Sequence, residues 1–460
     1  MAVGLALPVL PYPTTALAAP VPEALAEATV LDAVIVIATR NEGAVADAPA
    51  TVGVVPRQEI ERTQAQDLRE LFRYEPSVSV TGGFGRFGLG DVRIRGLGGN
   101  RVQLQVDGVN VADAFSIGSF SNADRDAVDV SILRQVEVLR GPASALYGSD
   151  ALGGTVRFVT LDPVDLLDGD GFTARFRAGT ASVDDSTRLG ATLAARDGAW
   201  SWLLHAQARE GHEAENFGSN EAPDATRTAN NPSDQRQRAL LAKLLYQLGD
   251  GDRLRLTVDA GESEATTSVL SARADSVVFG QRIRVLSLDA DDRKDRARLS
   301  VDGAHRFGFA IADSLRWQLH RQDSSTEQFT FENRASIVGA NAVSPVRRER
   351  RFDFFQREDG FELVADKGIG EATLLYGAQL TRADIRQKRD GRSLNLTTGA
   401  VSSTIFPDTF PVRDFPLSRT REWGFFVQGD LPFAGGDLRL LPAIRYDDYR
   451  LTPELDAIFV

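Results

Sequence analysis

The sequence predicts an antiparallel transmembrane β-barrel preceded by a smaller α+β domain. Three observations support this fold class. Apolar and polar residues alternate over long segments after about residue 170. Short connections between these segments alternate with long ones. No run of about 18 apolar residues occurs. Without such a run no helix can cross a membrane. In lipid, only a closed barrel then satisfies every backbone group.

The alternation assigns two chemically different faces to the predicted strands. Trp200 and Trp202 fall on one face of their segment, whereas His205 falls on the other. In the first segment, Phe172 shares a face with other apolar residues and Arg175 lies opposite. Arginines recur on the polar face in strand after strand, which indicates a polar lumen and a lipid-facing exterior.

The connections give the order of the wall. We expect strands near residues 172–180, 187–196, 200–210, 237–248, 253–261, 293–304, 311–322, 349–366, 372–386, 420–431 and 437–450. Short turns at 197–199, 249–252, 305–310, 367–371 and 432–436 alternate with long polar connections at 211–236, 262–292, 323–348 and 387–419. Single-chain barrels use an even number of strands, and plugged outer-membrane transporters have about 22. We therefore expect these 11 strands to form about half of a wall whose remainder is missing from the chain.

Composition excludes several classes of protein. Lys plus Arg number 52 and Asp plus Glu 64, a net charge of −12, which argues against a nucleic-acid binder. The chain has no cysteine, so disulfides, thiolate metal sites and thiol catalysis are excluded. Residues 1–19 are apolar and end near Ala16-Leu17-Ala18, a pattern typical of a cleaved signal peptide. A disordered leader is the alternative interpretation.

Two stretches of the first domain carry a family resemblance: Asp91–Val111, DVRIRGLGGNRVQLQVDGVNV, and Val136–Thr160, VEVLRGPASALYGSDALGGTVRFVT. Both resemble the plug domain of TonB-dependent outer-membrane receptors. Together with VTGGFGRFGLG (80–90), FPDTFPVRDFP (406–416) and LPAIRYDDYRLTPELD (441–456), they are most similar to the haem, haemoglobin, transferrin and lactoferrin receptor branch, here truncated at its C-terminus.

The resemblance implies an organisation and a function. It predicts a periplasmic segment with a TonB box at 20–40, a plug at 41–163 and the N-terminal half of the barrel at 164–460. The expected activity is active transport of haem or haem-protein iron across the cell outer membrane, with the TonB energy-transducing complex and membrane lipid as partners. Alternatives are a ferric-siderophore or cobalamin receptor and, less favoured, a passive outer-membrane binding protein. No resident cofactor is expected; haem or an iron chelate is the cargo.

The segment LDAVIVIATR at 31–40 resembles a TonB box. Such a short, β-prone segment can add as a strand to a partner by main-chain hydrogen bonds. The residues expected to couple are Asp32, Ala33, Val34, Ile35, Val36 and Ile37. The alternative is that they form the first strand of the plug itself.

Arginines in the plug need acidic partners if they face a crowded lumen. We expect Arg95 and Arg140 to form a lock with the inward-facing wall carboxylates Glu362 and Glu422. The alternative is that each arginine is solvated on a surface sheet.

Candidate cargo residues are few. Haem iron is held by His or Tyr in many proteins, and the resemblance implies one plug and one barrel histidine, but the plug has none. The barrel offers His212 in the first long connection and His205 and His320 on the predicted lumen face. Further candidates at the plug apex are Phe84, Arg86 and Phe87.

Catalysis and resident metals find no support in the sequence. Gly83 to Gly88 match G-x-G-x-x-G, yet the residues that follow have the period of a strand, whereas a dinucleotide site needs a helix there. No metalloprotease, serine-hydrolase or EF-hand pattern occurs, so we expect no catalytic residues and no metal site.

Overall fold

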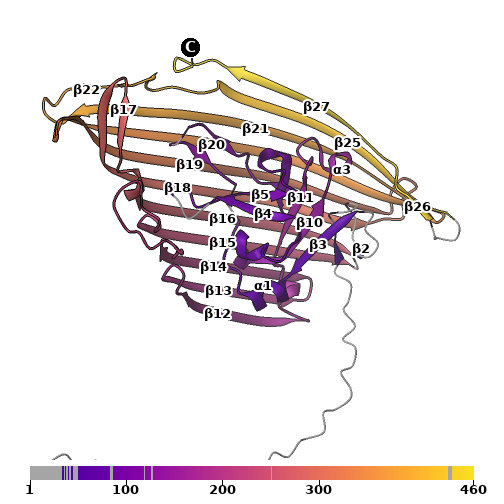
Figure 1. The fold of residues 1–460 in the computed structure, drawn as a ribbon. Helices are drawn as coiled ribbons and strands as arrows, with labels where there is room; N and C mark the ends of the chain where they lie inside the picture. The colour runs from indigo at the N-terminus through magenta and orange to yellow at the C-terminus, as the bar shows by residue number, and fades with distance from the viewer. Residues whose placement is uncertain are drawn as a thin grey trace, which may run out of the picture.

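A computed structural model describes residues 34–35, 37, 40, 43–44, 50–82, 86–118, 120–125, 128–249, 251–433 and 438–459. It divides into a small N-terminal domain, called the plug here, and a large curved sheet, called the wall (Figure 1). Among the described residues, no helix combines the length and the apolar character needed to cross a membrane. The expected signal peptide at 1–19, together with Asp32, Ala33, Val36 and Phe84, lies outside the described residues.

The plug is built on a mixed five-stranded sheet. Its strand order is β3-β10-β11-β6-β7, in which β11 and β6 are parallel and the other neighbours antiparallel. The strands are β3 (Thr51–Pro56), β10 (Leu133–Arg140), β11 (Gly154–Thr160), β6 (Val102–Val106) and β7 (Val109–Asn110). Most residues of β10 and all but one of β11 are buried, as expected for strands covered on both faces.

Short elements complete the plug. Its helices are α1 (Arg57–Thr63), α2 (Leu68–Leu71) and α3 (Ser144–Tyr147), with 3-10 turns η2 (Gly99–Arg101), η3 (Val130–Ile132) and η4 (Pro163–Asp165). Paired short strands are β1 (Val34–Ile35) with β2 (Gly43–Ala44), β4 (Val78–Gly82) with β5 (Leu89–Ile94), and β8 (Phe115–Ser116) with β9 (Asn122–Ala123). The α+β plug predicted from the sequence is confirmed.

The wall is antiparallel throughout, each long strand pairing with the next along the chain. Its long strands are β12 (Gly171–Ala181), β13 (Ser186–Asp197), β14 (Trp200–His212), β15 (Ser233–Gly249), β16 (Asp252–Ser268), β18 (Gln281–Arg306), β19 (Ser314–Val338), β20 (Asn341–Ile369), β21 (Ala372–Asn395), β25 (Leu417–Phe433) and β27 (Ala443–Glu454). Smaller elements are η5 (Leu270–Ala272), β17 (Asp275–Val278), β22 (Val401–Ser402), β23 (Thr404–Ile405), β24 (Asp408–Thr409) and β26 (Leu438–Leu440). Every expected wall strand has its counterpart.

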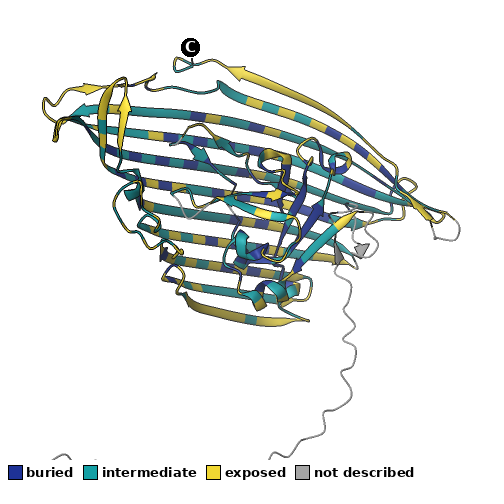
Figure 2. Cartoon of the chain, in the orientation of Figure 1, coloured by how far each residue is buried: buried dark blue, intermediate teal, exposed yellow. Residues whose placement is uncertain are grey.

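The predicted faces of the strands are confirmed. Along β14, Trp200 and Leu204 are exposed whereas Leu203 and His205 are buried, and Figure 2 shows this alternation of burial in strand after strand. Since the plug lies against the concave face of the sheet (Figure 1), the exposed apolar rows form the outer, lipid-facing surface.

The predicted lengths of two connections are wrong. Most of 262–292 belongs to β16 and β18, and β19 and β20 are joined by two residues where a connection of 323–348 was expected. Polar composition suggested loops, but the strands continue with charged residues paired across them, as in Arg293 Nη1 with Glu264 Oε1 at 3.0 Å. Such cross-strand ion pairs support a strand outside lipid as apolar packing does within it.

The wall is an open sheet in the described residues. β12 pairs only with β13, and β27 only with β25, so the two outer strands do not meet. The plug is joined to the inner face partly by apolar packing. Its core, with Leu104 and Phe158 fully buried, is continuous with Leu203 and Leu241 of the wall.

Candidate functional site at the interface of plug and wall

A buried ionic network joins the plug to the wall. Asp107 lies in the tight turn between β6 and β7, and its Oδ2 is 3.0 Å from Nη2 of Arg298 on β18. Arg298 Nη2 also lies 3.2 Å from Asp259 Oδ2, and the Arg298 side chain has no exposed surface. The plug residue Asp107 is therefore neutralised by a cation that the wall supplies.

Asp162, where the chain passes from plug to wall, extends the same network. Lys243 Nζ lies 2.7 Å from Asp162 Oδ1, and Arg255 Nη1 lies 3.0 Å from Asp162 Oδ2. Burial by itself raises the pKa of Asp107, but the charges of Lys243, Arg298 and Arg255 outweigh it and hold that pKa well below its usual range. Both carboxylates thus stay ionised, and removing one partner leaves a buried charge uncompensated.

The predicted lock between Arg140 or Arg95 and the wall is wrong. Arg140 pairs with Glu75 inside the plug, and Arg95 is exposed and has no ion pair among the described residues. Glu362 instead pairs with Arg40, at 3.2 Å between Nη1 and Oε2. The two-residue alternation of side chains along the strand placed Glu362 on the inner face correctly. It could not indicate which plug arginine reaches it.

Arg40, the last residue of the segment that resembles a TonB box, contacts both plug and wall. Its guanidinium carbon lies 4.6 Å from the ring centre of Tyr147 in the plug and 4.5 Å from that of Phe426 in the wall. Ile37 is fully buried nearby, and its backbone N–H donates to Glu137 Oε2 at 2.9 Å. Val34 and Ile35 form β1 and pair with β2. The described end of this segment is thus enclosed between plug and wall.

The plug apex is also fastened to the wall. Arg86, a candidate cargo residue, forms an ion pair of 2.8 Å with Asp292 on β18 and donates to Thr330 Oγ1 at 2.7 Å. Its guanidinium carbon lies 4.9 Å from the ring centre of Phe87. Asp292 and Arg86 are both nearly buried, so this arginine is occupied by the wall.

A second apical contact was not predicted from the sequence. Phe115, in the hairpin β8–β9, stacks on Phe354 of β20 with ring centres 5.5 Å apart and meets Phe415 edge-on at 5.2 Å. Asn122 N–H donates to Gln328 Oε1 at 2.8 Å, and Gln328 Nε2 donates back to Asn122 O at 2.9 Å. Phe415 belongs to the long connection before β25, so the hairpin touches wall and outer loop together. The aromatic residues lie far apart in sequence, and no local pattern indicates their contact.

The histidines have protein partners. His205 lies between Ser131 Oγ of the plug, at 3.1 Å, and Thr192 Oγ1, at 2.7 Å. His320 Nε2 is 3.1 Å from Glu358 Oε1, and both His205 and His320 face the plug as their parity predicted. His212 is the last residue of β14, and its Nδ1 lies 3.0 Å from Asp234 Oδ1. Across the part of the chain that the structure describes, no cluster of three or more potential ligands could hold a metal ion.

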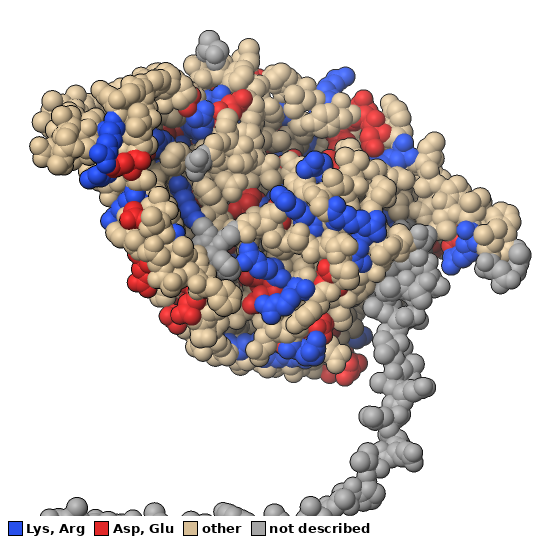
Figure 3. All heavy atoms as spheres, in the orientation of Figure 1, with Lys and Arg blue, Asp and Glu red and all other residues tan. Residues whose placement is uncertain are grey.

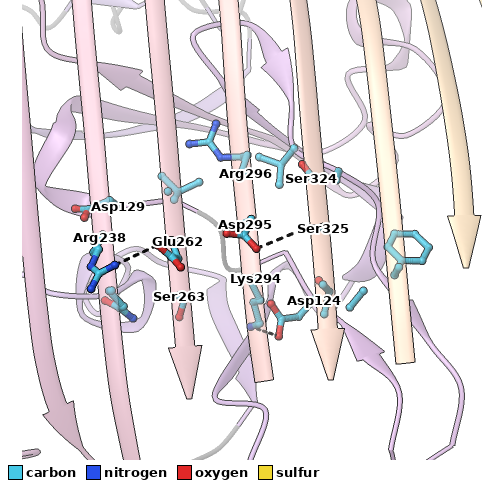
Figure 4. Close-up of a pocket in the computed structure, with 18 of the residues that line it drawn as sticks. Asp124, Asp129, Arg238, Glu262, Ser263, Lys294, Asp295, Arg296, Ser324 and Ser325 are labelled. Atoms are coloured by element: carbon cyan, nitrogen blue, oxygen red, sulfur yellow. Dashed lines mark hydrogen bonds and ion pairs between the residues drawn. The ribbon is translucent and has the colours of Figure 1, made fainter. Parts of the chain in front are cut away.

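Several small cavities remain between plug and wall in the described residues, among them the following two. The first, about 110 Å³, is bordered by plug Asp124 and Asp129 and by wall strands β15, β16, β18 and β19 (Figure 4). Lys294 reaches across it to Asp124 Oδ2 at 2.5 Å. Pockets for drug-sized ligands measure roughly 300–1,000 Å³. This cavity is therefore too small for a haem-sized cargo while the plug is in place.

The second cavity, about 120 Å³, is acidic. Its lining includes Asp113 and Asp150 of the plug and Glu358, Glu422 and Tyr449 of the wall, with Arg125 of the plug as the basic group among them. Loss of surrounding water, and secondly the charge of Asp150, raise the pKa of Asp113 to about 6 although part of its side chain remains exposed. Glu422, expected in the arginine lock, thus lies among carboxylates. Over the plug-bearing face as a whole, acidic and basic side chains are interspersed (Figure 3).

Comparison with known proteins agrees with this architecture. The family model "TonB-dependent Receptor Plug Domain" matches residues 44–155, and "TonB dependent receptor-like, beta-barrel" matches residues 246–456. The hemoglobin-haptoglobin-binding protein A of Haemophilus influenzae is 33% identical over 213 residues, 43% of this chain and 20% of the relative. A probable hemoglobin and hemoglobin-haptoglobin-binding protein 1 of the same species is 24% identical over 72% of this chain and 32% of its own.

Solved structures show the same fold. The ferripyoverdine receptor of the outer membrane of Pseudomonas aeruginosa aligns with a TM-score of 0.62 and 17% identity, over 92% of this chain and 55% of that one. The copper transporter OprC aligns with a TM-score of 0.61 and 15% identity, over 88% and 55%. The chain thus spans about half the length of these structures and less of the curated relatives. Its plug, its wall and the two family models together establish that the chain belongs to the TonB-dependent receptors of the outer membrane.

Proposed function

We propose that this chain acts in the import of haem or haem-protein iron across the outer membrane. The observation that carries the proposal is its similarity to proteins named for haemoglobin binding, which extends from the plug into the wall. Transport requires a path between plug and wall, and the Asp107–Arg298 and Arg86–Asp292 ion pairs hold the plug against the wall. Cargo therefore passes only after some of these contacts break.

The energy for that change is proposed to come from the TonB complex through Asp32 to Ile37. Strand addition needs free main-chain groups, but the Ile37 N–H donates to Glu137 and the Ile37 side chain is buried. Engagement must therefore draw this segment out of the space between plug and wall, which breaks the contacts of Arg40. A pull on the segment acts directly on the plug–wall interface.

The coupling proposal is tested with Val36→Pro. Proline removes one main-chain donor, so uptake should be lost while cargo binding stays unchanged. The control Val52→Pro lies in β3 of the plug sheet, where proline should disturb the plug itself and weaken cargo binding as well. Unchanged uptake in Val36→Pro would remove the coupling role.

Cargo contact is proposed at the plug apex and the long connections, including Arg86 and Phe87, with Phe84, His205, His212 and His320 as weaker candidates. Arg86 is paired with Asp292, so cargo carrying a carboxylate would have to exchange with that wall carboxylate. Haem carries such carboxylates. Arg86→Gln should weaken haem binding, whereas Arg62→Gln, on an exposed helix of the plug, should leave it unchanged.

The cargo itself is decided by direct titration. The purified full chain in detergent is titrated with haem and, separately, with a ferric hydroxamate siderophore and cobalamin. We expect a shift of the haem Soret band that saturates, with no saturable change for the other two. The second candidate, a siderophore receptor, rests on the similar fold of the ferripyoverdine receptor and predicts the reverse. Binding without uptake in cells carrying TonB would favour a passive binding protein.

A further inference from the structure

Three arginines form a row on the outer surface of the wall: Arg382 on β21, Arg421 on β25 and Arg450 on β27. Their sequence neighbours Thr381, Glu422 and Tyr449 line the acidic cavity facing the plug. Since adjacent residues of a strand project to opposite faces, the three arginines point away from the plug, and all three are exposed.

The row is in register across three strands. Arg382 is paired with Arg421, and Arg421 with Arg450, in the antiparallel ladder. Side chains at such positions start only about 4.5–5.5 Å apart, and like charges there are unfavourable. The row therefore concentrates positive charge that an anion would stabilise.

Among the described residues, carboxylates pair with the first arginine of the row only. Asp359 of β20 is paired with Arg382 in the ladder and also lies 3.8 Å from Arg321. Asp384 Oδ2 lies 3.8 Å from Arg382 Nη2, but Asp384 is also 2.7 Å from Arg419. Within the described residues, Arg421 and Arg450 form no ion pair. On the same face, residues 382–386, 419–421 and 448–450 contribute five arginines and two aspartates.

Other arginines of the outer surface are paired differently. Arg293 on β18 is within 3.0 Å of three carboxylates, those of Glu262, Glu264 and Asp295. Around Arg293 the carboxylates thus outnumber the arginine, whereas Arg421 and Arg450 have another arginine as their ladder neighbour. A general need for charged residues outside lipid does not explain why three arginines lie in register on β21, β25 and β27.

The row lies at the margin of the lipid-facing band. The next residues on the same face, toward the short turns, are Leu380 on β21 and Trp423 and Phe425 on β25, with Trp423 and Phe425 42% and 51% exposed. Toward the long connections the face becomes charged. Lipid head groups occupy this boundary in a membrane, and aromatic side chains mark it.

We propose that Arg382, Arg421 and Arg450 bind the phosphate groups of lipid head groups in the outer leaflet. Guanidinium groups pair with phosphate oxygens in a bidentate manner, and three in one row can share one phosphate or hold two. The site anchors the wall laterally, at a surface separate from the plug interface and the cargo path. It does not depend on which cargo is carried.

Trp423, beside the row, provides a local reporter. The chain has four tryptophans, so replacing Trp200, Trp202 and Trp317 by Phe leaves Trp423 alone. The full chain is reconstituted in phosphatidylcholine bilayers, and fluorescence quenching by brominated phosphatidic acid is compared with quenching by brominated phosphatidylcholine. We expect phosphatidic acid to be preferred at Trp423 by about fivefold for each arginine engaged, since a basic residue at the surface contributes about that factor.

The variants identify the arginines as the cause. Arg421→Gln with Arg450→Gln should reduce the preference at Trp423 to nearly none, whereas Arg421→Lys with Arg450→Lys should retain most of it. Arg293→Gln is the matched control on the same outer surface and should change nothing. A second reporter with Trp317 alone should show no effect of the double glutamine variant.

Three results would overturn the proposal. Equal quenching by both lipids at Trp423 means that no phosphate site exists there, and an unchanged preference in the glutamine variants means that other residues form it. Loss of the preference on adding millimolar inorganic phosphate would mean that free phosphate is the ligand. If the double variant does not assemble, the single Arg421→Gln and Arg450→Gln variants carry the test, each with a loss of about fivefold.

Discussion

Arg298 on β18 and Asp107 in the plug form an ion pair of 3.0 Å in which the arginine side chain is completely excluded from solvent. Removing a charge from water costs free energy, so the pair itself contributes little net stability. Breaking it would leave a buried charge without a partner, and the free-energy cost of that state holds the plug in place. This contact links the tight turn of the plug to the middle of a wall strand 191 residues later.

Removing the arginine should loosen the plug. Arg298→Met keeps much of the side-chain volume but leaves Asp107 and Asp259 without one cation, so we expect seating to weaken by roughly 3–5 kcal/mol. The measurement is cleavage of the plug by protease as a function of urea. Arg293→Met, on the same strand but at an exposed ion pair, should cost no more than about 1 kcal/mol. Equal losses for the two variants would contradict the role of burial.

The seating of the plug should depend on Asp113 and pH. The pKa of Asp113 is raised to about 6, against about 4 in an unfolded chain, so the folded protein binds this proton more tightly. The tighter binding of this proton therefore stabilises the seated plug fully below about pH 4, and this stabilisation is lost as the pH rises through about 6. Asp113→Asn should make the plug more resistant to protease at pH 7.5 and flatten the profile between pH 5 and 7. Asp67→Asn, at the half-buried cap of α2 and away from this cavity, should keep the profile of the parent. A variant profile that still changes by the same amount would assign the pH effect to another group.

Arg40 should govern access to the coupling segment. Arg40→Ala removes the ion pair with Glu362 and the contacts with Tyr147 and Phe426, so residues 34–44 should be cleaved by protease at least about tenfold faster, as a loss of about 1.4 kcal/mol implies. The rest of the plug should be cleaved at the parental rate. Arg62→Ala, at an exposed pair with Glu59, serves as the control and should leave cleavage of the segment unchanged. Equal protection of the segment in Arg40→Ala would show that Ile37 alone holds it.

Phe115 should couple the plug hairpin to the outer connection. A double-mutant cycle of Phe115→Leu and Phe415→Leu is expected to give a coupling free energy of about 0.5–1.5 kcal/mol, typical of an aromatic pair. The measurement is urea-dependent cleavage of the hairpin. Phe115→Leu with Phe279→Leu should be additive, because Phe279 contacts Phe406 instead. Additivity of Phe115 and Phe415 would remove the connection between loop and plug.

Much of the fold follows from the sequence because it is periodic. Two-residue alternation placed Trp200 and His205 on opposite faces. The plug was predicted from the resemblance of Asp91–Val111 and Val136–Thr160 to a known domain. The signal from alternation failed where strands leave the membrane. Residues 323–348 carry polar residues on both faces, so composition indicated a loop where β19 and β20 are held by cross-strand ion pairs.

The sequence by itself determined that arginines of this plug need carboxylates and that Glu362 faces inward. Only the tertiary structure decided the pairs: Arg140 with Glu75, Arg40 with Glu362, and Asp107 with Arg298. The physical reason is that parity fixes the direction of a side chain, a property of its own strand, whereas an ion pair requires two atoms to lie within about 4 Å. That distance depends on how far the plug is inserted and rotated within the wall, which no local pattern of residues encodes.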